Sequence, residues 1–414
     1  MFMHRMTACL LAAVLLLAGC GREPEYWEQT LPQLAPEAPT EAAPQEEIRA
    51  VWIPVMHYAA WMTGRTEQQF RDTVAGVFAD CAALGLNTVF VHVRAYGDAY
   101  YASTLFPRGA YLTEDYDPLA VMTEEAHARG LAVHAWINPL RCQTPEGLER
   151  TDKRYPLRQW YDDRNGTYLV EVDGHAWLNP AYPEVRQFVA DGAAELLAQY
   201  DVEGLHIDDY FYPTTDAEFD AQAFAESGQS DLAAWRRENC TALIKLLYDT
   251  VKAQNPALVF SISPQGNPET NSGQLYADAA RWCSEPGYCD WIVPQIYYGY
   301  RNAVCPFTAT LHWWEMTADS SRLVIGLAAY KCGREDVWAG SGADEWLNDS
   351  GVLSRELAEV LAGSADGAAF YSCNDLFSDE APMPAERERI RKILSHAVTN
   401  PAALRCEPVL PERN

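Results

Sequence analysis

Positive charge is scarce in this chain. Its 414 residues include 31 lysines and arginines against 58 aspartates and glutamates, which gives a formal net charge of −27. Sequence-independent binding to nucleic acid needs clustered cations that neutralise phosphates, so this balance excludes that class of partner. No Walker loop and no Gly-x-Gly-x-x-Gly turn follows any of the strands expected below, which disfavours a nucleotide-binding sheet.

Long apolar runs are absent after the N-terminus, so no mature segment is expected to span a membrane. The first twenty residues combine a basic start, an apolar run over 10–18 and the ending Leu-Ala-Gly-Cys at 17–20. This layout is typical of a bacterial lipoprotein signal, in which Cys20 becomes the lipidated first residue. The alternative is a plain signal peptide with an incidental cysteine. Residues 21–47 are rich in Pro, Glu, Ala and Gln, and we expect a disordered tether that leaves an extracytoplasmic domain anchored to the membrane.

Paired Cys-x-x-Cys motifs are absent among the eleven cysteines, and no His, Cys or Asp cluster has metal-ligand spacing. We therefore expect no catalytic metal and no cofactor. Cys81 and Cys240 fall on expected helix faces and are interpreted as small core residues. Cys283 and Cys289 flank a turn-like segment and can form a disulfide, a pairing that spacing alone does not establish.

Alternation of two residue patterns begins at residue 48. Short β-branched or aromatic runs predict strands at 49–53, 88–93, 132–137, 204–207, 259–263, 291–295, 323–327 and 368–371. Amphipathic stretches predict helices near 66–84, 117–130, 183–200, 231–254, 272–283, 307–318, 343–362 and 384–398. Eight strands that are each followed by a helix predict the α/β class and a TIM (β/α)8 barrel over residues 48–400, with a C-terminal tail at 401–414. A doubly wound sheet is the alternative.

An extended insertion at 141–182 separates the third expected strand from its helix. Its Asn165-Gly166 pair suggests a tight hairpin turn. Extended loops after barrel strands lie at the carboxyl-terminal mouth, where active sites are built. We therefore expect the insertion to form a wall of the active-site cleft.

Carboxyl groups follow the ends of several expected strands. Asp208 and Asp209 close the fourth strand, and glycoside hydrolysis needs one carboxyl group as acid and a second as base or nucleophile. The structural alternative is that one of the two only caps the following loop. Asp98 and Glu269 are the further catalytic candidates that can complete the pair, and Glu171 of the insertion is a third.

Aromatic side chains are dense at the same positions, in a chain with 13 Trp, 22 Tyr and 13 Phe. Flat rings stack on sugars, and a few amide or guanidinium groups suffice to orient a ligand. The expected substrate-binding residues are therefore Tyr96, Trp136, Tyr210, Tyr297 and Tyr298, together with Arg94, Asn138 and Gln295. Ser263, Gln265, Tyr330 and Tyr371 share strand-end positions without an assigned role. His92 and His134 alternate with apolar residues and are interpreted as core groups, whereas His206 can orient Asp208.

Several sequence blocks resemble glycosyl-hydrolase-like family 10. They are Arg-Ala-Val-Trp at 49–52, His-Ala-Trp-Ile-Asn-Pro at 134–139, Leu-Asn-Pro at 178–180 and Gly-Leu-His-Ile-Asp-Asp-Tyr-Phe-Tyr-Pro at 204–213. The resemblance implies a TIM-barrel glycosidase domain on a secreted or lipid-anchored bacterial protein. It also adds Asn179 to the substrate-binding residues.

A lipoprotein of this type cleaves peptidoglycan glycan strands from which the stem peptides have been removed, so the resemblance implies a cell-wall glycan as substrate. Such strands expose lactyl carboxylates, which Arg94, Arg141, Arg301 or Lys331 can receive. Another polysaccharide is the alternative substrate. A carbohydrate-binding lipoprotein with an inactive barrel is the alternative function.

Overall fold

The computed structural model describes residues 46–163 and 166–399. The expected signal peptide, Cys20, nearly all of the expected tether and the C-terminal tail at 401–414 lie outside these residues. Over the described ranges, no helix has the length and the apolar character needed to cross a membrane.

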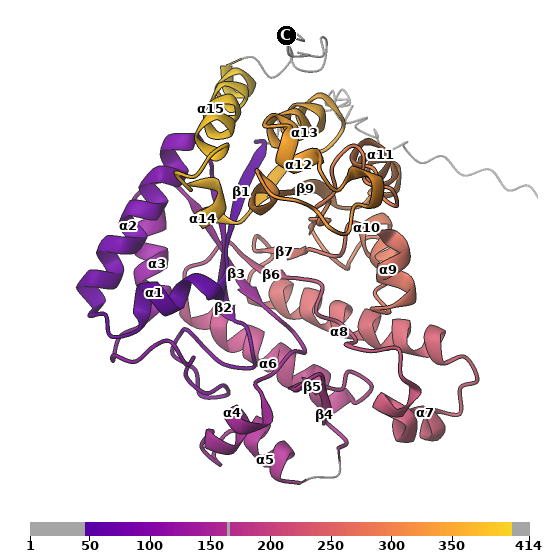
Figure 1. Ribbon diagram of the computed structural model, residues 1–414. Helices are drawn as coiled ribbons and strands as arrows, with labels where there is room; N and C mark the ends of the chain where they lie inside the picture. The colour runs from indigo at the N-terminus through magenta and orange to yellow at the C-terminus, as the bar shows by residue number, and fades with distance from the viewer. Residues whose placement is uncertain (1–45, 164–165, 400–414) are drawn as a thin grey trace, which may run out of the picture. The chain divides into compact units, whose positions relative to one another are not determined.

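Eight parallel strands close into a barrel, which confirms the predicted fold class (Figure 1). The strands are β1 (Ile48–Ile53), β2 (Thr88–Arg94), β3 (Ala132–Ile137), β6 (Gly204–Ile207), β7 (Val259–Ile262), β8 (Trp291–Ile292), β9 (Arg322–Ala328) and β10 (Gly367–Tyr371). Each strand pairs with its sequence neighbour within the barrel, and β1 pairs with β10 to close it. Strand β8 is shorter than the predicted 291–295 because Pro294 has no N–H to donate, and Gln295 resumes pairing through isolated bridges to Gln265 and Gly326.

Long helices surround the strands at nearly the predicted positions: α2 (Glu67–Leu84), α3 (Pro118–His127), α6 (Pro183–Gln199), α8 (Leu232–Gln254), α11 (Phe307–Thr317), α13 (Val352–Ala362) and α15 (Met383–Thr399). Two predicted helices are broken. The stretch expected at 272–283 forms α9 (Pro268–Gly273) and α10 (Ala279–Ser284), because Tyr276 between them has a φ of 54°. The stretch expected at 343–362 forms α12 (Glu345–Asn348) and α13.

Apolar side chains form two clusters. The larger one lies between the strands and the surrounding helices and includes Cys81 and Cys240. The smaller one fills the barrel interior with large rings, among them Trp52, Phe90 and Trp136. Inward-facing layers of this kind make the interior of a TIM barrel a packed core rather than a pore.

His206 belongs to this interior. The Trp52 indole N–H donates to its Nε2 at 3.0 Å, so Nδ1 carries the proton and donates to Ser261 Oγ at 2.8 Å. Burial holds the pKa of His206 well below its usual range, which keeps the ring neutral. The prediction that His206 orients Asp208 directly is therefore wrong, because both ring nitrogens are engaged elsewhere.

Cys283 and Cys289 are free thiols in the structure. Their sulfur atoms are directed at the main-chain oxygens of Ala280 and Trp282 respectively. The disulfide considered for this pair is not formed.

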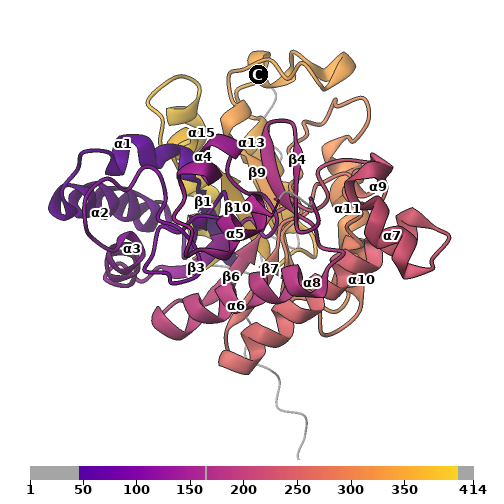
Figure 2. The ribbon, with the colours of Figure 1, turned by 90° about the horizontal axis from the view of Figure 1, so that it is seen from below.

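The insertion lies at the end of the barrel that faces the viewer in Figure 2. It contains α4 (Pro145–Arg150), α5 (Pro156–Asp162) and an antiparallel hairpin of β4 (Leu169–Val172) and β5 (His175–Leu178). The hairpin turns at Asp173 and Gly174, whose φ angles of 49° and 74° suit a tight turn of this kind. The turn predicted at Asn165-Gly166 is misplaced: Gly166 precedes the hairpin, and Asn165 lies outside the described residues.

Candidate active site

A cavity of about 310 Å³ opens at the carboxyl-terminal end of the barrel strands. It brings together many of the predicted site residues: Asp208, Asp209, Tyr96, Trp136, Asn138, Tyr210, Gln295 and Tyr297. They come from the ends of β2, β3, β6 and β8. The volume and the aromatic lining are typical of a small-molecule or sugar site.

Asp208 lies at the floor of the cavity with 3% of its surface exposed. It continues the inward side of β6, since His206 two residues earlier faces the barrel interior. The Trp136 indole N–H donates to Oδ2 at 3.0 Å, whereas Oδ1 is buried with no hydrogen-bond partner in the described structure. Burial, reinforced by the neighbouring Asp209 carboxylate, raises the pKa of Asp208 well above its usual range. A buried carboxyl group of this kind can donate a proton at neutral pH.

Asp209 has a different environment. The side-chain amides of Gln265 and Gln295 donate to its two oxygens, the Gln295 bond being 3.1 Å long. Burial raises the pKa of Asp209, and these two amide donors oppose that effect by stabilising the carboxylate. Asp209 is therefore the better candidate for the anionic member of the pair.

The two glutamines are themselves held in place. The Asn271 side chain bonds both the N–H and the C=O of Gln265, at 3.0 and 2.8 Å. Gln295 Nε2 also donates to the Ser263 carbonyl at 3.0 Å. Gly266 lets the two loops meet, because a Cβ at that position would lie 2.4 Å from the Gln295 carbonyl oxygen. The amide pair is thus preorganised around Asp209.

The wall beside Asp208 is a stack of flat groups. The His92 ring lies 3.7 Å from the Trp136 ring at an interplanar angle of 9°. His92 Nδ1 faces the Val55 N–H, so the protonated Nε2 donates to Asn138 Oδ1 at 3.0 Å. Burial lowers the pKa of His92 to about 3, so the ring is neutral. Although His92 was interpreted only as a core group, it lines the cavity and supports Trp136.

Arg141 lies among aromatic rings at the edge of the cavity. Its guanidinium carbon is 4.9 Å from the centres of both the Tyr96 and Tyr210 rings and 6.0 Å from that of Trp177 on β5. Its Nε is buried without a hydrogen-bond partner in the described structure. No other lysine or arginine lines the cavity within the described ranges. Arg141 is the only residue of the insertion at 141–182 among the described residues that line the cavity, so the insertion contributes a cation but not the expected wall.

Arg94 does not line the cavity. Strand β2 shifts its register between His92 and Arg94, and such a bulge reverses the alternation of side chains. The Arg94 guanidinium is consequently buried outside the barrel, 4.2 Å from the centre of the Phe106 ring. Gly192 on α6 leaves it room, because a Cβ there would lie 2.3 Å from Arg94 Nη1. The expectation that Arg94 contacts substrate is corrected by this bulge.

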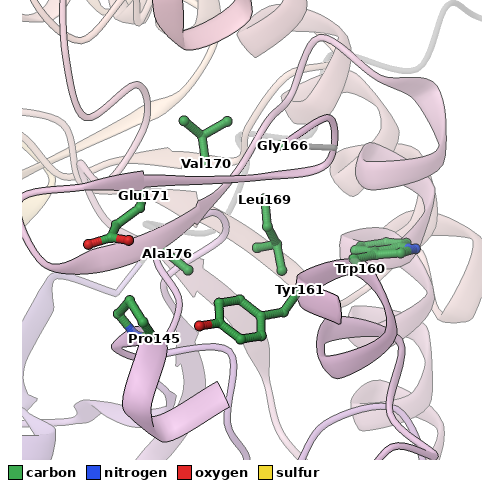
Figure 3. A pocket seen from close by; sticks show the side chains of 8 residues that line it. All are labelled: Pro145, Trp160, Tyr161, Gly166, Leu169, Val170, Glu171 and Ala176. Atoms are coloured by element: carbon green, nitrogen blue, oxygen red, sulfur yellow. The ribbon is translucent and has the colours of Figure 1, made fainter. Parts of the chain in front are cut away.

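The other predicted carboxylates lie elsewhere. Asp98 Oδ1 accepts the N–H groups of Ala95 and Tyr96 at 3.1 and 2.9 Å, so the side chain closes its own loop. Glu269 is exposed in the first turn of α9. Glu171 lines a second cavity of about 240 Å³ between the hairpin and α4–α5 (Figure 3). None of the three joins the Asp208–Asp209 pair.

Two of the predicted substrate-binding residues also lie outside the cavity. Asn179 is buried where the insertion ends, and its side chain bonds Thr167 and Ala181 of the insertion itself. Tyr298 packs over Gly266. The structure places them as supports for the loops around the site.

Several residues that line the cavity had no assigned role: Trp52, Met56, Ser263, Gln265, Tyr330 and Tyr371. The sequence predicts only a strand-end position for four of them, Ser263, Gln265, Tyr330 and Tyr371. Trp52 could have been predicted to face the barrel interior, because alternate residues of β1 point to the same side and Ala50, two residues earlier, also faces the interior. Met56 has no such signal, because it belongs to the short helical turn after β1, η1 (Val55–His57).

Barrel enzymes that hydrolyse glycosides place carboxyl groups among aromatic side chains at this end of the strands, and the chain falls in that class. Solved structures agree on the fold. The PgaB (BpsB) glycoside hydrolase domain from Bordetella bronchiseptica is 15% identical, with a TM-score of 0.55 over 84% of this chain and 99% of that domain. α-L-Fucosidase isoenzyme 2 from Paenibacillus thiaminolyticus is 14% identical, with a TM-score of 0.56 over 86% of this chain and 50% of that one.

Sequence comparison identifies the family. The model described as Glycosyl hydrolase-like 10 matches residues 47–339. Glycosyl hydrolase YngK of Bacillus subtilis (strain 168) is 32% identical over 355 residues, which cover 78% of this chain and 68% of YngK. Glycosyl hydrolase DigH of Escherichia coli (strain K12) is 28% identical over 398 residues, which cover 85% of this chain and 89% of DigH. The chain belongs to the glycosyl hydrolase-like 10 family and is a glycoside hydrolase.

Proposed function

We propose that the protein is a lipid-anchored extracytoplasmic enzyme that hydrolyses O-glycosidic bonds in bacterial cell-wall glycan strands, specifically peptidoglycan stripped of its stem peptides. The observation that carries this proposal is that two carboxyl groups in different environments, Asp208 and Asp209, line the same cavity as Arg141, whose guanidinium lies against the Tyr96 ring. Asp208 is suited to donate a proton to the leaving oxygen, and Asp209 is suited to act as the anion.

Arg141 supports an anionic glycan. Removal of the stem peptide leaves a lactyl carboxylate on each muramic acid residue, and a guanidinium is the side chain best matched to a carboxylate. The other cations that the sequence offered as partners of a lactyl carboxylate are engaged elsewhere. Arg301 pairs with Asp344 at 2.9 Å, and Lys331 pairs with Asp336 at 2.6 Å.

The lipid anchor is supported by the Leu-Ala-Gly-Cys ending at 17–20 and the short apolar run before it. Mass spectrometry of the N-terminal peptide from membrane-extracted protein tests it. Diacylglyceryl modification of Cys20 is expected, and a Cys20→Ser variant should lose both the modification and the membrane association. An unmodified peptide that begins elsewhere would refute the anchor.

Activity is tested with full-length protein in detergent and peptide-stripped glycan strands, with products read by mass spectrometry. Short muro-oligosaccharides are expected from the parent protein. Asp208→Asn and Asp209→Asn should each lower the rate at least about a hundredfold. Glu269→Gln, an acid outside the cavity, is the matched control and should retain full activity.

The substrate charge is tested separately. Arg141→Gln should raise KM for strands that carry free lactyl carboxylates by about tenfold or more, the loss of one charge-assisted contact. On strands whose carboxylates are converted to amides, the variant and the parent should differ little. An equal effect on both strands would show that Arg141 does not recognise the carboxylate.

A further inference from the structure

Both carboxyl groups of the cavity come from one point of the chain. Within the described residues that line it, Asp208 and Asp209 are the only acids. Their Cα atoms are about 3.8 Å apart because the residues are consecutive, and both side chains enter from the end of β6. A glycosidase with a protein nucleophile instead places two carboxyl groups on either side of the scissile bond.

The opposite wall has no carboxyl group among the described residues that line the cavity. Strand β10 lies across the barrel from β6 in the strand order, and it ends in Tyr371. Tyr297 and Tyr330 pack near it, with ring centres 5.8 and 6.0 Å from that of Tyr371. Burial raises the pKa of each of these phenols, so they are protonated at neutral pH and weak as nucleophiles.

The two carboxyl groups also have different environments, which suit them to different roles in catalysis. Asp209 is held as a carboxylate by two amide donors, Gln265 and Gln295. Asp208 keeps one oxygen buried and unpartnered at the cavity floor. A proton donor next to a fixed anion, without an acid across the sugar ring, matches hydrolysis in which a group of the substrate attacks the anomeric carbon.

We propose that this group is the 2-acetamido group of an N-acetylhexosamine, oriented by Asp209 and assisted by proton donation from Asp208. The inference rests on the glycan-strand function proposed above and deepens it. The sugar whose glycosidic bond is cut must then carry an N-acetyl group, and its anomeric configuration is retained after two displacements.

Hydrolysis by this route takes two displacements at C1. The Asp208 proton passes to the glycosidic oxygen as the C1–O bond breaks, while the acetamido carbonyl oxygen forms a bond to C1. Asp209 accepts a hydrogen bond from the acetamido N–H and offsets the positive charge of the resulting oxazolinium ion. Water then attacks C1 and gives a proton to the Asp208 carboxylate. The bond from C1 to the acetamido oxygen breaks, which restores the acetamido group and the acid.

The first experiment changes only the acyl group of the substrate. Peptide-stripped strands are chemically N-deacetylated, and one half is re-acetylated while the other half is trifluoroacetylated, which makes the amide oxygen a poor nucleophile. Full-length protein should cleave the trifluoroacetylated strands at least about a hundredfold more slowly, given the advantage of an intramolecular nucleophile. Rates within threefold of each other, or first products of inverted configuration by NMR, would overturn the inference.

The second experiment does not require strand cleavage. N-acetylglucosamine-thiazoline imitates the bicyclic intermediate, and calorimetry should show that it binds at least about a hundredfold more tightly than N-acetylglucosamine. Asp209→Asn should lose most of this difference, whereas Glu269→Gln should keep it. Tight thiazoline binding without strand cleavage would uphold the inference and reject the cell-wall substrate. Thiazoline binding no tighter than that of the parent sugar would overturn the inference, whichever strands are cleaved.

Discussion

Replacement of Asp220 by alanine is expected to destabilise the loop that carries the acid pair. Asp220 lies between β6 and α8 and forms a salt bridge with Arg236 in which both side chains have 0% exposure. Arg236 Nε contacts Asp220 Oδ2 at 2.9 Å, and Nη2 contacts Oδ1 at 2.6 Å. Arg236 also donates to the Asp216 carbonyl at 2.6 Å and to Tyr276 Oη at 3.2 Å.

The magnitude follows from the loss of a counter-charge inside the protein. Removing one partner of a buried pair leaves an uncompensated charge and costs about 3–5 kcal/mol. An exposed pair contributes about 0–1 kcal/mol. The Lys245–Asp249 pair on α8 has exposed fractions of 49% and 55%, which makes Asp249→Ala the matched control.

Thermal and urea unfolding of the two variants measure the difference. Asp220→Ala should lower the melting temperature by about 6 °C or more, since 1 kcal/mol corresponds to about 2–4 °C in a large domain. Asp249→Ala should change it by less than about 4 °C, because an exposed pair contributes at most about 1 kcal/mol. The double variant Asp220→Leu, Arg236→Met should recover at least about half of the loss, because it removes both buried charges.

Two results would refute this reasoning. A loss below about 1 kcal/mol for Asp220→Ala would mean that water or another group compensates Arg236. A double variant less stable than Asp220→Ala would mean that the hydrogen bonds from Arg236 to the Asp216 carbonyl and Tyr276, rather than charge balance, hold the loop.

Three further predictions concern the cavity and its support. Because burial raises the pKa of Asp208, the unfolded chain ionises this group more readily than the folded one, so its contribution to stability falls as pH rises above about 4. Asp208→Asn should therefore raise the melting temperature at pH 7 but not at pH 3, and a lower melting temperature at pH 7 would contradict the burial argument. Trp136→Phe keeps a ring against His92 but removes the indole N–H that stabilises the Asp208 carboxylate, so the pKa of Asp208 should rise further. The alkaline limb of the kcat/KM profile should therefore move about one pH unit higher. An unmoved limb would mean that another group titrates. Gly192→Ala places a Cβ 2.3 Å from Arg94 Nη1 and from a Phe106 ring carbon, so it should cost about 1–3 kcal/mol in urea unfolding, whereas Gly76→Ala, with open space around its Cβ, should not destabilise.

Local sequence patterns were sufficient to predict much of the fold. Eight runs of β-branched and aromatic residues, each followed by an amphipathic stretch, predicted a closed parallel barrel, and the structure has one. The predicted ends were wrong where a single residue interrupts an element. Pro294 shortens β8, and Tyr276 divides a predicted helix in two. Such interruptions depend on backbone conformations that a periodic pattern does not contain.

The position of a residue at the end of a strand was likewise sufficient to predict the central residues of the site. Asp208, Trp136 and Gln295 were expected at the mouth, and all three line the cavity. That argument assumes strict alternation, and it failed for Arg94, where the register shift in β2 turns the side chain outward. It also failed for Asp98, whose carboxylate is taken by the N–H groups of its own loop.

The sequence by itself thus determined the fold class, the family and the strand that carries the acids, because each is encoded in contiguous residues. Tertiary structure alone decided which groups meet. Arg141 enters the cavity through contacts with Tyr96 and Tyr210, from two other barrel loops, and Asp209 is held by glutamines 56 and 86 residues away. These contacts arise from barrel closure and loop packing, which bring together residues that no local pattern relates.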